Sequence, residues 1–226
     1  MQPTDRRDAT VEQEPLQAGG GTVRRMTRPK PGERRVHILQ ALAAMLEAPR
    51  GEKITTAALA ARIGVSEAAL YRHFASKAQM FEGLIDFIEQ TLFALVNQIV
   101  AKEPNGVLQA RAIALMLIHF STKNAGMTRV LTCEALVGEH ERLAARVNQM
   151  IERIEASLRQ CLRMGLMEAN AQPDGATVPL PEGYDPGVRA SLVVSYVIGC
   201  WHRYAQSGFA RTPLEHADEQ LRLILQ

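Results

Sequence analysis

Four polar side chains in one short stretch, Tyr71, Arg72, His73 and Lys77, are of types that can bind DNA. A tyrosine hydroxyl can donate to a phosphate, and an arginine or histidine can contact a phosphate or an acceptor edge of guanine. Lys77 falls in the first turn of a predicted helix, where free backbone amides also attract a phosphate oxygen. The sequence therefore predicts a surface that binds double-stranded DNA.

The residues before them have the pattern of two short helices joined by a tight turn. Gly64 can adopt the positive φ that such a turn needs. Thr55 and Ser66 are the predicted N-caps of the two helices. The small Ala68 and Ala69 allow close approach to the groove floor or to thymine methyl groups. The full set of predicted DNA contacts is Thr55, Thr56, Ser66, Ala68, Ala69, Tyr71, Arg72, His73 and Lys77.

Positive charge is concentrated near the N-terminal end. The formal net charge is +2, but residues 24–35 hold six basic residues and one glutamate, whereas the chain from residue 78 onward holds 13 basic and 16 acidic residues. A protein that meets a polyanion has such a distribution, although a solvated tail looks similar. Taken alone, Lys53 and Arg62 are better explained as surface charges of an ordinary helical hairpin.

Composition places the chain among soluble intracellular proteins. Its apolar share is 46%, and its three cysteines (Cys133, Cys161 and Cys200) lie far apart without a CxxC pair. This usage favours buried thiols in a reducing cytoplasm over a disulfide framework. No apolar core of a signal peptide lies near the N-terminus, and the apolar runs are shorter than the roughly 20 residues of a membrane span. We therefore predict a cytoplasmic protein that does not enter a membrane.

Nearly all of the chain beyond residue 32 has helical period, so we predict an all-α fold of about nine helices. The predicted organisation is a disordered basic arm (1–32), a helix-turn-helix domain (33–78) and a larger helical domain for dimerisation and partner binding (79–226). Glycine, proline and charge dominate the arm, which is typical of disorder.

Several helix ends are predicted from local signals. Ser76 and Gln79 form a capping box that begins a helix, and further helices are expected at 127–137 and 140–165. A loop is expected over 167–186 because it holds four prolines. Asp185-Pro186 and Thr212-Pro213 are each expected to begin one of the last two helices.

The helix expected at 187–206 is apolar on nearly every side, which predicts that a second copy of the chain covers part of it. Gly199 would let another helix approach closely. A homodimer would carry two helix-turn-helix domains and prefer a near-palindromic DNA site with half-sites about 34–36 Å apart.

The stretch TTAALAARIGVSEAALYRHFASK, residues 55–77, resembles the helix-turn-helix of the TetR family. Two later motifs, GMTRVLT and RLAARVNQMIERIEASLRQCLR, resemble the nucleoid-occlusion branch of that family. The resemblance covers about residues 33–165. It implies a nucleoid-associated DNA-binding dimer that inhibits assembly of the division protein FtsZ over the nucleoid.

The same resemblance implies a groove that takes up the C-terminal tail of FtsZ. Its predicted residues are Phe87, Met116, His119, Lys123 and Asn124. Phe87 and Asn124 match the branch and Lys123 preserves a charge, whereas Met116 and His119 stand where the branch differs. Leu95 occupies a position where an arginine is usual, so one cationic contact to an acidic tail is lost.

Two alternatives stay open. Most TetR-like regulators bind a small-molecule inducer, and Met116, His119, Phe120 and Met127 could line such a pocket, although a stripe of this kind also suits a core. A helical interaction module without DNA binding is the other alternative. We predict that the protein is not an enzyme and has no catalytic residues, metal or cofactor, because no HExxH spacing, nucleophile elbow or phosphate-binding glycine loop occurs.

Overall fold

The computed structural model describes residues 31–48, 54–171 and 180–226. Nine α-helices and one 3₁₀ turn make up the secondary structure of these ranges, in which no strand occurs, so the predicted all-α fold is confirmed. The elements are α1 (Pro31–Met45), α2 (Thr56–Arg62), α3 (Glu67–Tyr71), α4 (Lys77–Lys102), α5 (Gly106–Lys123), α6 (Ala125–Leu131), η1 (Glu134–Leu136), α7 (Arg142–Ala171), α8 (Pro186–Gln206) and α9 (Ala217–Leu225).

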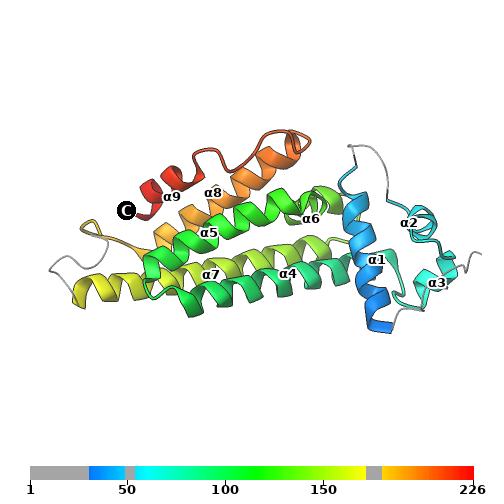
Figure 1. Ribbon diagram of the computed structural model, residues 1–226, viewed down its shortest axis with the longest axis horizontal. Coiled ribbons are helices and arrows are strands. Elements are labelled where there is room, and N and C mark those ends of the chain that lie inside the picture. Colours follow the sequence, from blue (N-terminus) through cyan, green and yellow to red (C-terminus); the bar gives the residue numbers. More distant parts are fainter. Residues whose placement is uncertain (1–30, 49–53, 172–179) are drawn as a thin grey trace, which may run out of the picture.

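Helices α1 to α3 form a small head at one end of the molecule (Figure 1). Leu59, Leu70 and Phe74 are fully buried between these helices and pack with Ile38 of α1. Gly64 has a φ of 67° in the turn between α2 and α3, as predicted. Only glycine adopts this conformation at little cost. Gly64 therefore permits the tight turn between α2 and α3.

The predicted helix starts that depend on local hydrogen bonds are confirmed. The hydroxyls of Thr55 and Ser66 accept from the amides three residues later, at 3.1 and 3.2 Å. Gln79 donates its amide to the Ser76 hydroxyl as predicted, but its own side chain accepts from the amide of Ala75, one residue before the Ser76 amide that a capping box uses. Asp185 accepts from the first amides of α8. Each cap satisfies donors that a helix start would otherwise leave free.

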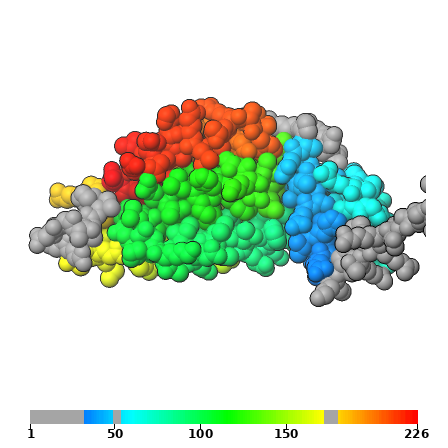
Figure 2. Space-filling view, viewed as in Figure 1, coloured from blue at the N-terminus to red at the C-terminus, as the bar shows by residue number. Residues whose placement is uncertain are grey.

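The body is an elongated bundle in which α4, α5, α7 and α8 run lengthwise and α9 lies on α5 and α8 (Figures 1 and 2). Among the described helices, α4 is the one long and apolar enough to span a membrane by length and composition. Its apolar residues Leu84, Ile85, Ile88 and Leu92 are instead fully buried, and it packs against α1, α5 and α7. α4 therefore buries one apolar face inside the bundle.

Ion pairs join α4 to α7 along their exposed edge. Arg146 contacts both Asp86 and Glu89, and Arg153 also contacts Glu89. Glu89 is nearly buried, and two arginines compensate the cost of removing its charge from water. These ion pairs join α4 and α7 across a distance of 57 to 64 residues in the sequence.

The helix predicted at 127–137 was wrong. α6 begins at Ala125 and ends at Leu131, because Cys133 adopts a left-handed φ of 58° and the chain continues as the 3₁₀ turn η1. A left-handed residue breaks the helical hydrogen-bond ladder. No glycine or proline marks this break, so the local pattern could not reveal it.

Two further helix boundaries differ from the predictions. The last helix begins at Ala217, after His216 in a left-handed conformation, and not at Thr212-Pro213. α7 continues to Ala171, into the region predicted as a loop over 167–186. Residues 172–179 of that loop lie outside the described residues.

The predicted domain boundaries stay predictions. Pro31 is the first residue of α1, so the end of the predicted arm is helical, and residues 1–30 lie outside the described residues. The boundary at residue 78 falls in the first turn of α4, which continues from the head into the body.

Candidate DNA interface and adjoining groove

Helices α2 and α3 lie at the free end of the head, away from the bundle (Figure 1). Ala68 is exposed on α3, Ala69 is half-buried, and 45% of Tyr71 is exposed. The hydroxyls of Thr55 and Ser66 are already used as N-caps. The exposed face of α3 therefore has small side chains at its centre and a polar side chain at its C-terminal end.

Hydrogen bonds tie α2 to α3 across this face. The Thr56 hydroxyl donates to Oε2 of Glu67 at 2.6 Å, and the Tyr71 hydroxyl lies 3.5 Å from the Thr56 oxygen. The structure thus brings together Thr56 and Tyr71, which were predicted, with Glu67, which was not. The one signal for Glu67 in the sequence is that it is the single acidic residue among residues 54–77.

Arg72 and His73 follow α3 and differ in exposure. Arg72 is exposed and free to reach outward, whereas His73 is half-buried. The His73 carbonyl accepts from Nη1 of Arg35 at 2.5 Å, and the Arg35 guanidinium lies 4.2 Å from the centroid of the Phe74 ring. Arg35 therefore fastens α1 to the end of α3, a role that the sequence did not single out.

Lys77 lies in the first turn of α4, as predicted, but it has a protein partner. Its ammonium group pairs with Glu139, which lies between η1 and α7 in the body. It also lies 5.7 Å from the Phe81 ring centroid. A DNA phosphate would compete with Glu139 for this ammonium group.

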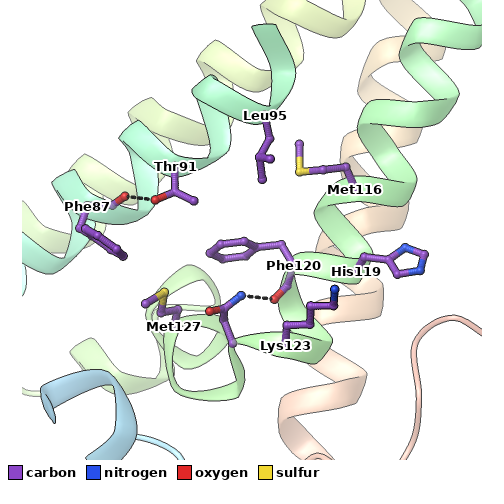
Figure 3. Close-up of a pocket in the computed structure, with 9 residues that line it drawn as sticks. Phe87, Thr91, Leu95, Met116, His119, Phe120, Lys123 and Met127 are labelled. Carbon is purple, nitrogen blue, oxygen red and sulfur yellow. Dashed lines mark hydrogen bonds between the residues drawn. The ribbon is translucent and has the colours of Figure 1, made fainter. Parts of the chain in front are cut away.

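A groove of about 400 Å³ opens between α4, α5 and α6 (Figure 3). All five residues predicted from the family groove line it, together with four more. Its lining residues are Phe87, Thr91, Leu95, Met116, His119, Phe120, Lys123, Asn124 and Met127. Phe120 and Met127 were predicted for an inducer pocket. The predicted FtsZ-tail groove and the predicted inducer pocket therefore coincide in this one groove. Thr91 was not predicted.

The groove is apolar at its floor and cationic at one rim. Asn124 donates to the Phe120 carbonyl at 2.8 Å and Thr91 donates to the Phe87 carbonyl at 2.8 Å (Figure 3). Each of these two polar side chains is thus held by a hydrogen bond to the backbone carbonyl four residues before it. Lys123 is exposed beside them and can attract an anionic group.

The outward face of α8 carries apolar and small residues. The exposed fractions of Val188 and Leu192 are 56% and 47%, and a Cβ at Gly199 would have no neighbour within 4 Å. Other apolar residues of this helix face inward: Trp201, for example, is buried and donates its indole N–H to the Leu117 carbonyl at 3.1 Å. Only part of the predicted apolar surface is therefore left for a partner.

Within residues 31–48, 54–171 and 180–226, no group of three or more histidine, cysteine, aspartate or glutamate side chains could hold a metal ion. Burial raises the pKa of the Cys133 and Cys161 thiols. A raised pKa favours the neutral thiol over the nucleophilic thiolate at neutral pH.

Comparison with known proteins decides the family. The tetR family of bacterial regulatory proteins matches residues 39–84, and the SlmA-like family, described as a tetracyclin repressor-like C-terminal domain, matches residues 105–226. The chain is 46% identical over 193 residues to the nucleoid occlusion factor SlmA of Idiomarina loihiensis, an alignment that covers 85% of this chain and 94% of the relative. The chain belongs to the SlmA branch of the TetR family.

Other similarities agree with this membership. The nucleoid occlusion factor SlmA of Alteromonas mediterranea is 45% identical over 84% of this chain and 93% of its own length. A TetR transcription regulator of Haloarcula marismortui has the same fold, with a TM-score of 0.70 at 15% identity over 86% of this chain and 97% of its own. The family resemblance seen in the sequence is confirmed. TetR-family proteins are regulators, so the prediction that the chain is not an enzyme is also confirmed.

Proposed function

We propose that the chain binds near-palindromic chromosomal sites as a homodimer and, while bound, inhibits FtsZ assembly over the nucleoid, in the cytoplasm. One observation carries this proposal. Helix α4 begins in the head with Lys77, and its next turns supply Phe87, Thr91 and Leu95 to the groove. A single continuous helix therefore joins the surface for DNA to the surface for a protein partner.

On the DNA side, α3 enters the major groove and the polar groups around it contact the backbone. In this proposal Tyr71, Arg72 and Lys77 bind phosphates, Lys77 after leaving Glu139, and the Ala68 methyl group approaches a thymine methyl group. The phosphate contacts give affinity that falls steeply as salt rises, because bound counterions are released. This salt dependence separates DNA binding from a helical interaction module that does not touch DNA.

The outward face of α8 supports the homodimer. Val188, Leu192, Ser195 and Gly199 are exposed and recur at spacings of four, three and four residues, which is the seam of a helix pair. The small Ser195 and Gly199 permit a close approach of the two helix backbones. A second copy on this face gives a two-fold dimer with two heads.

The groove supports binding of an FtsZ tail segment. Phe87, Met116, Phe120 and Met127 supply apolar and polarisable contacts, and Lys123 supplies a positive charge at the rim. By the resemblance to this branch, Leu95 stands where an arginine is expected. Binding of an acidic tail to this groove should therefore depend more on apolar burial than binding to a groove with an arginine at this position. Its affinity should also fall less as the salt concentration rises.

A polymer sedimentation assay tests this function. FtsZ is assembled with GTP and pelleted alone, with the protein, and with the protein bound to a duplex that carries its selected site. We expect the DNA-bound protein to reduce the pelleted fraction most. The same pelleted fraction in all three conditions would refute inhibition of FtsZ assembly. That result would not bear on the proposal that the protein binds DNA.

A ligand-responsive repressor is the second candidate, favoured by the groove itself. Its volume of about 400 Å³ falls in the range of small-molecule sites, and its lining is mostly apolar. Genome-wide mapping of bound sites separates the two functions. Many sites that avoid the replication terminus support division control, whereas one site beside the protein's own gene supports local repression.

A further inference from the structure

Glu67 is the single acidic residue among residues 54–77, which form the proposed DNA surface. It opens α3 and is exposed. A carboxylate at this place repels phosphates and weakens binding to every DNA sequence. We therefore expect Glu67 to make a favourable contact, on the preferred DNA sequence, that offsets this repulsion.

The carboxylate of Glu67 is held in one orientation. The Thr56 hydroxyl donates to Oε2 at 2.6 Å, and the Tyr71 hydroxyl lies 3.5 Å beyond, on the Thr56 oxygen. Oε1 takes no part in this bond and keeps its acceptor capacity. A side chain fixed in this way loses little conformational freedom when it meets a ligand.

Position also favours contact with bases. In a helix-turn-helix, the N-terminal residues of the second helix face the base edges. Ser66 is occupied as the N-cap and Ala68 ends at a methyl group, so Glu67 is the long polar side chain of the first turn.

The chemistry of a carboxylate restricts what it can read. It only accepts hydrogen bonds, and the donors in the major groove are the amino groups of cytosine and adenine. Adenine presents the acceptor N7 beside its amino group, which repels a second carboxylate oxygen, whereas cytosine presents the amino group without such a neighbour.

We propose that Glu67 is a specificity-determining residue that accepts a hydrogen bond from the amino group of one cytosine in each half-site. This inference rests on the proposed DNA binding. Thr56 is then a positioning residue that holds the carboxylate toward the base. In a dimer the selected site carries this cytosine at two symmetry-related positions.

Glu67→Gln gives a sharp test because glutamine keeps an oxygen for Thr56 but changes the pattern offered to the base. Glutamine pairs with adenine through N6 and N7. Wild type and variant, both as full chains, select sites from a random duplex library, and affinities are then measured by fluorescence anisotropy for every single base-pair change.

We expect the wild type to lose about 5- to 150-fold in affinity when the cytosine pair is replaced. Glu67→Gln should lose this preference at the two symmetric positions, shift there toward adenine, and bind random DNA more tightly. Thr56→Val, which removes the hydroxyl, should weaken the cytosine preference without shifting it. The matched charge control, Glu47→Gln in the turn after α1, should leave the selected sequence unchanged.

Two outcomes would overturn the inference, and they are distinguishable. If Glu67→Gln selects the same sequence as the wild type and its affinity changes equally for all sequences, Glu67 only fastens α2 to α3 or adds charge. If the wild type itself selects no sequence, the proposed DNA-binding function fails, and the inference fails with it. Thermal unfolding followed by circular dichroism confirms that each variant is folded.

Discussion

The ion pair between Lys77 and Glu139 predicts that a change in the body will alter DNA affinity. Lys77 belongs to the start of α4 beside the head, and Glu139 precedes α7. To bind a phosphate, the ammonium group must leave this carboxylate. Glu139→Gln should therefore tighten DNA binding, because it removes both the competing anion and its repulsion of the phosphate.

The magnitude follows from the exposure of the pair. The side chains of Lys77 and Glu139 are 34% and 19% exposed, so solvent screens their attraction, and such a pair contributes about 0.2–1 kcal/mol. Its loss should raise DNA affinity by about 1.4- to 5-fold for each head, or up to about 30-fold for a dimer. The free energy of unfolding should fall by no more than about 1 kcal/mol.

Fluorescence anisotropy of a labelled duplex at fixed salt measures the affinity, and urea unfolding measures the stability. Glu141→Gln, at an exposed position two residues away, is the matched control because it makes the same change in net charge. The reasoning is refuted if Glu139→Gln leaves the affinity unchanged. It is also refuted if Glu141→Gln raises the affinity equally, since a general charge effect would then suffice.

Three further predictions concern the groove, the junction of head and body, and acid stability. Phe87→Ala should abolish FtsZ binding and leave DNA affinity intact, at a cost of about 1–2 kcal/mol in unfolding free energy since Phe87 is half-buried; loss of DNA binding would contradict this. Gly126→Ala should lower the unfolding free energy by about 1–3 kcal/mol in urea titrations, because its Cβ would lie 1.9 Å from the Ala43 carbonyl oxygen; unchanged stability would refute this contact. Hydrogen bonding from Arg111 holds the pKa of Asp218 below its ordinary value of 3.8, so the carboxylate stabilises the fold above that value and ceases to do so as the pH falls through its lowered pKa. Asp218→Asn should therefore destabilise at neutral pH, and a difference from wild type that persists at the lowest pH would contradict the assignment.

Local chemistry in the sequence determined the starts of α2, α3, α4 and α8, but not those of α6 and α9. The caps at Thr55, Ser66, Ser76 and Asp185 depend on hydrogen bonds that span two to four residues, so a short window contains both partners. Helical periodicity likewise separated buried from exposed positions along α4 and α7. The family motifs then marked five groove positions, although they did not bring them together.

Tertiary structure alone decided the break of the predicted helix at Cys133, the pairing of Lys77 with Glu139 and the brace of Glu67 by Thr56. The two residues of the Lys77 pair are 62 positions apart, and their meeting depends on how α7 docks against α4. Thr91 joins the groove for the same reason, because α4, α5 and α6 must first be set side by side. Periodicity assigns a side chain to a face of its helix, but only the docked arrangement of the helices determines which side chains of another element meet that face.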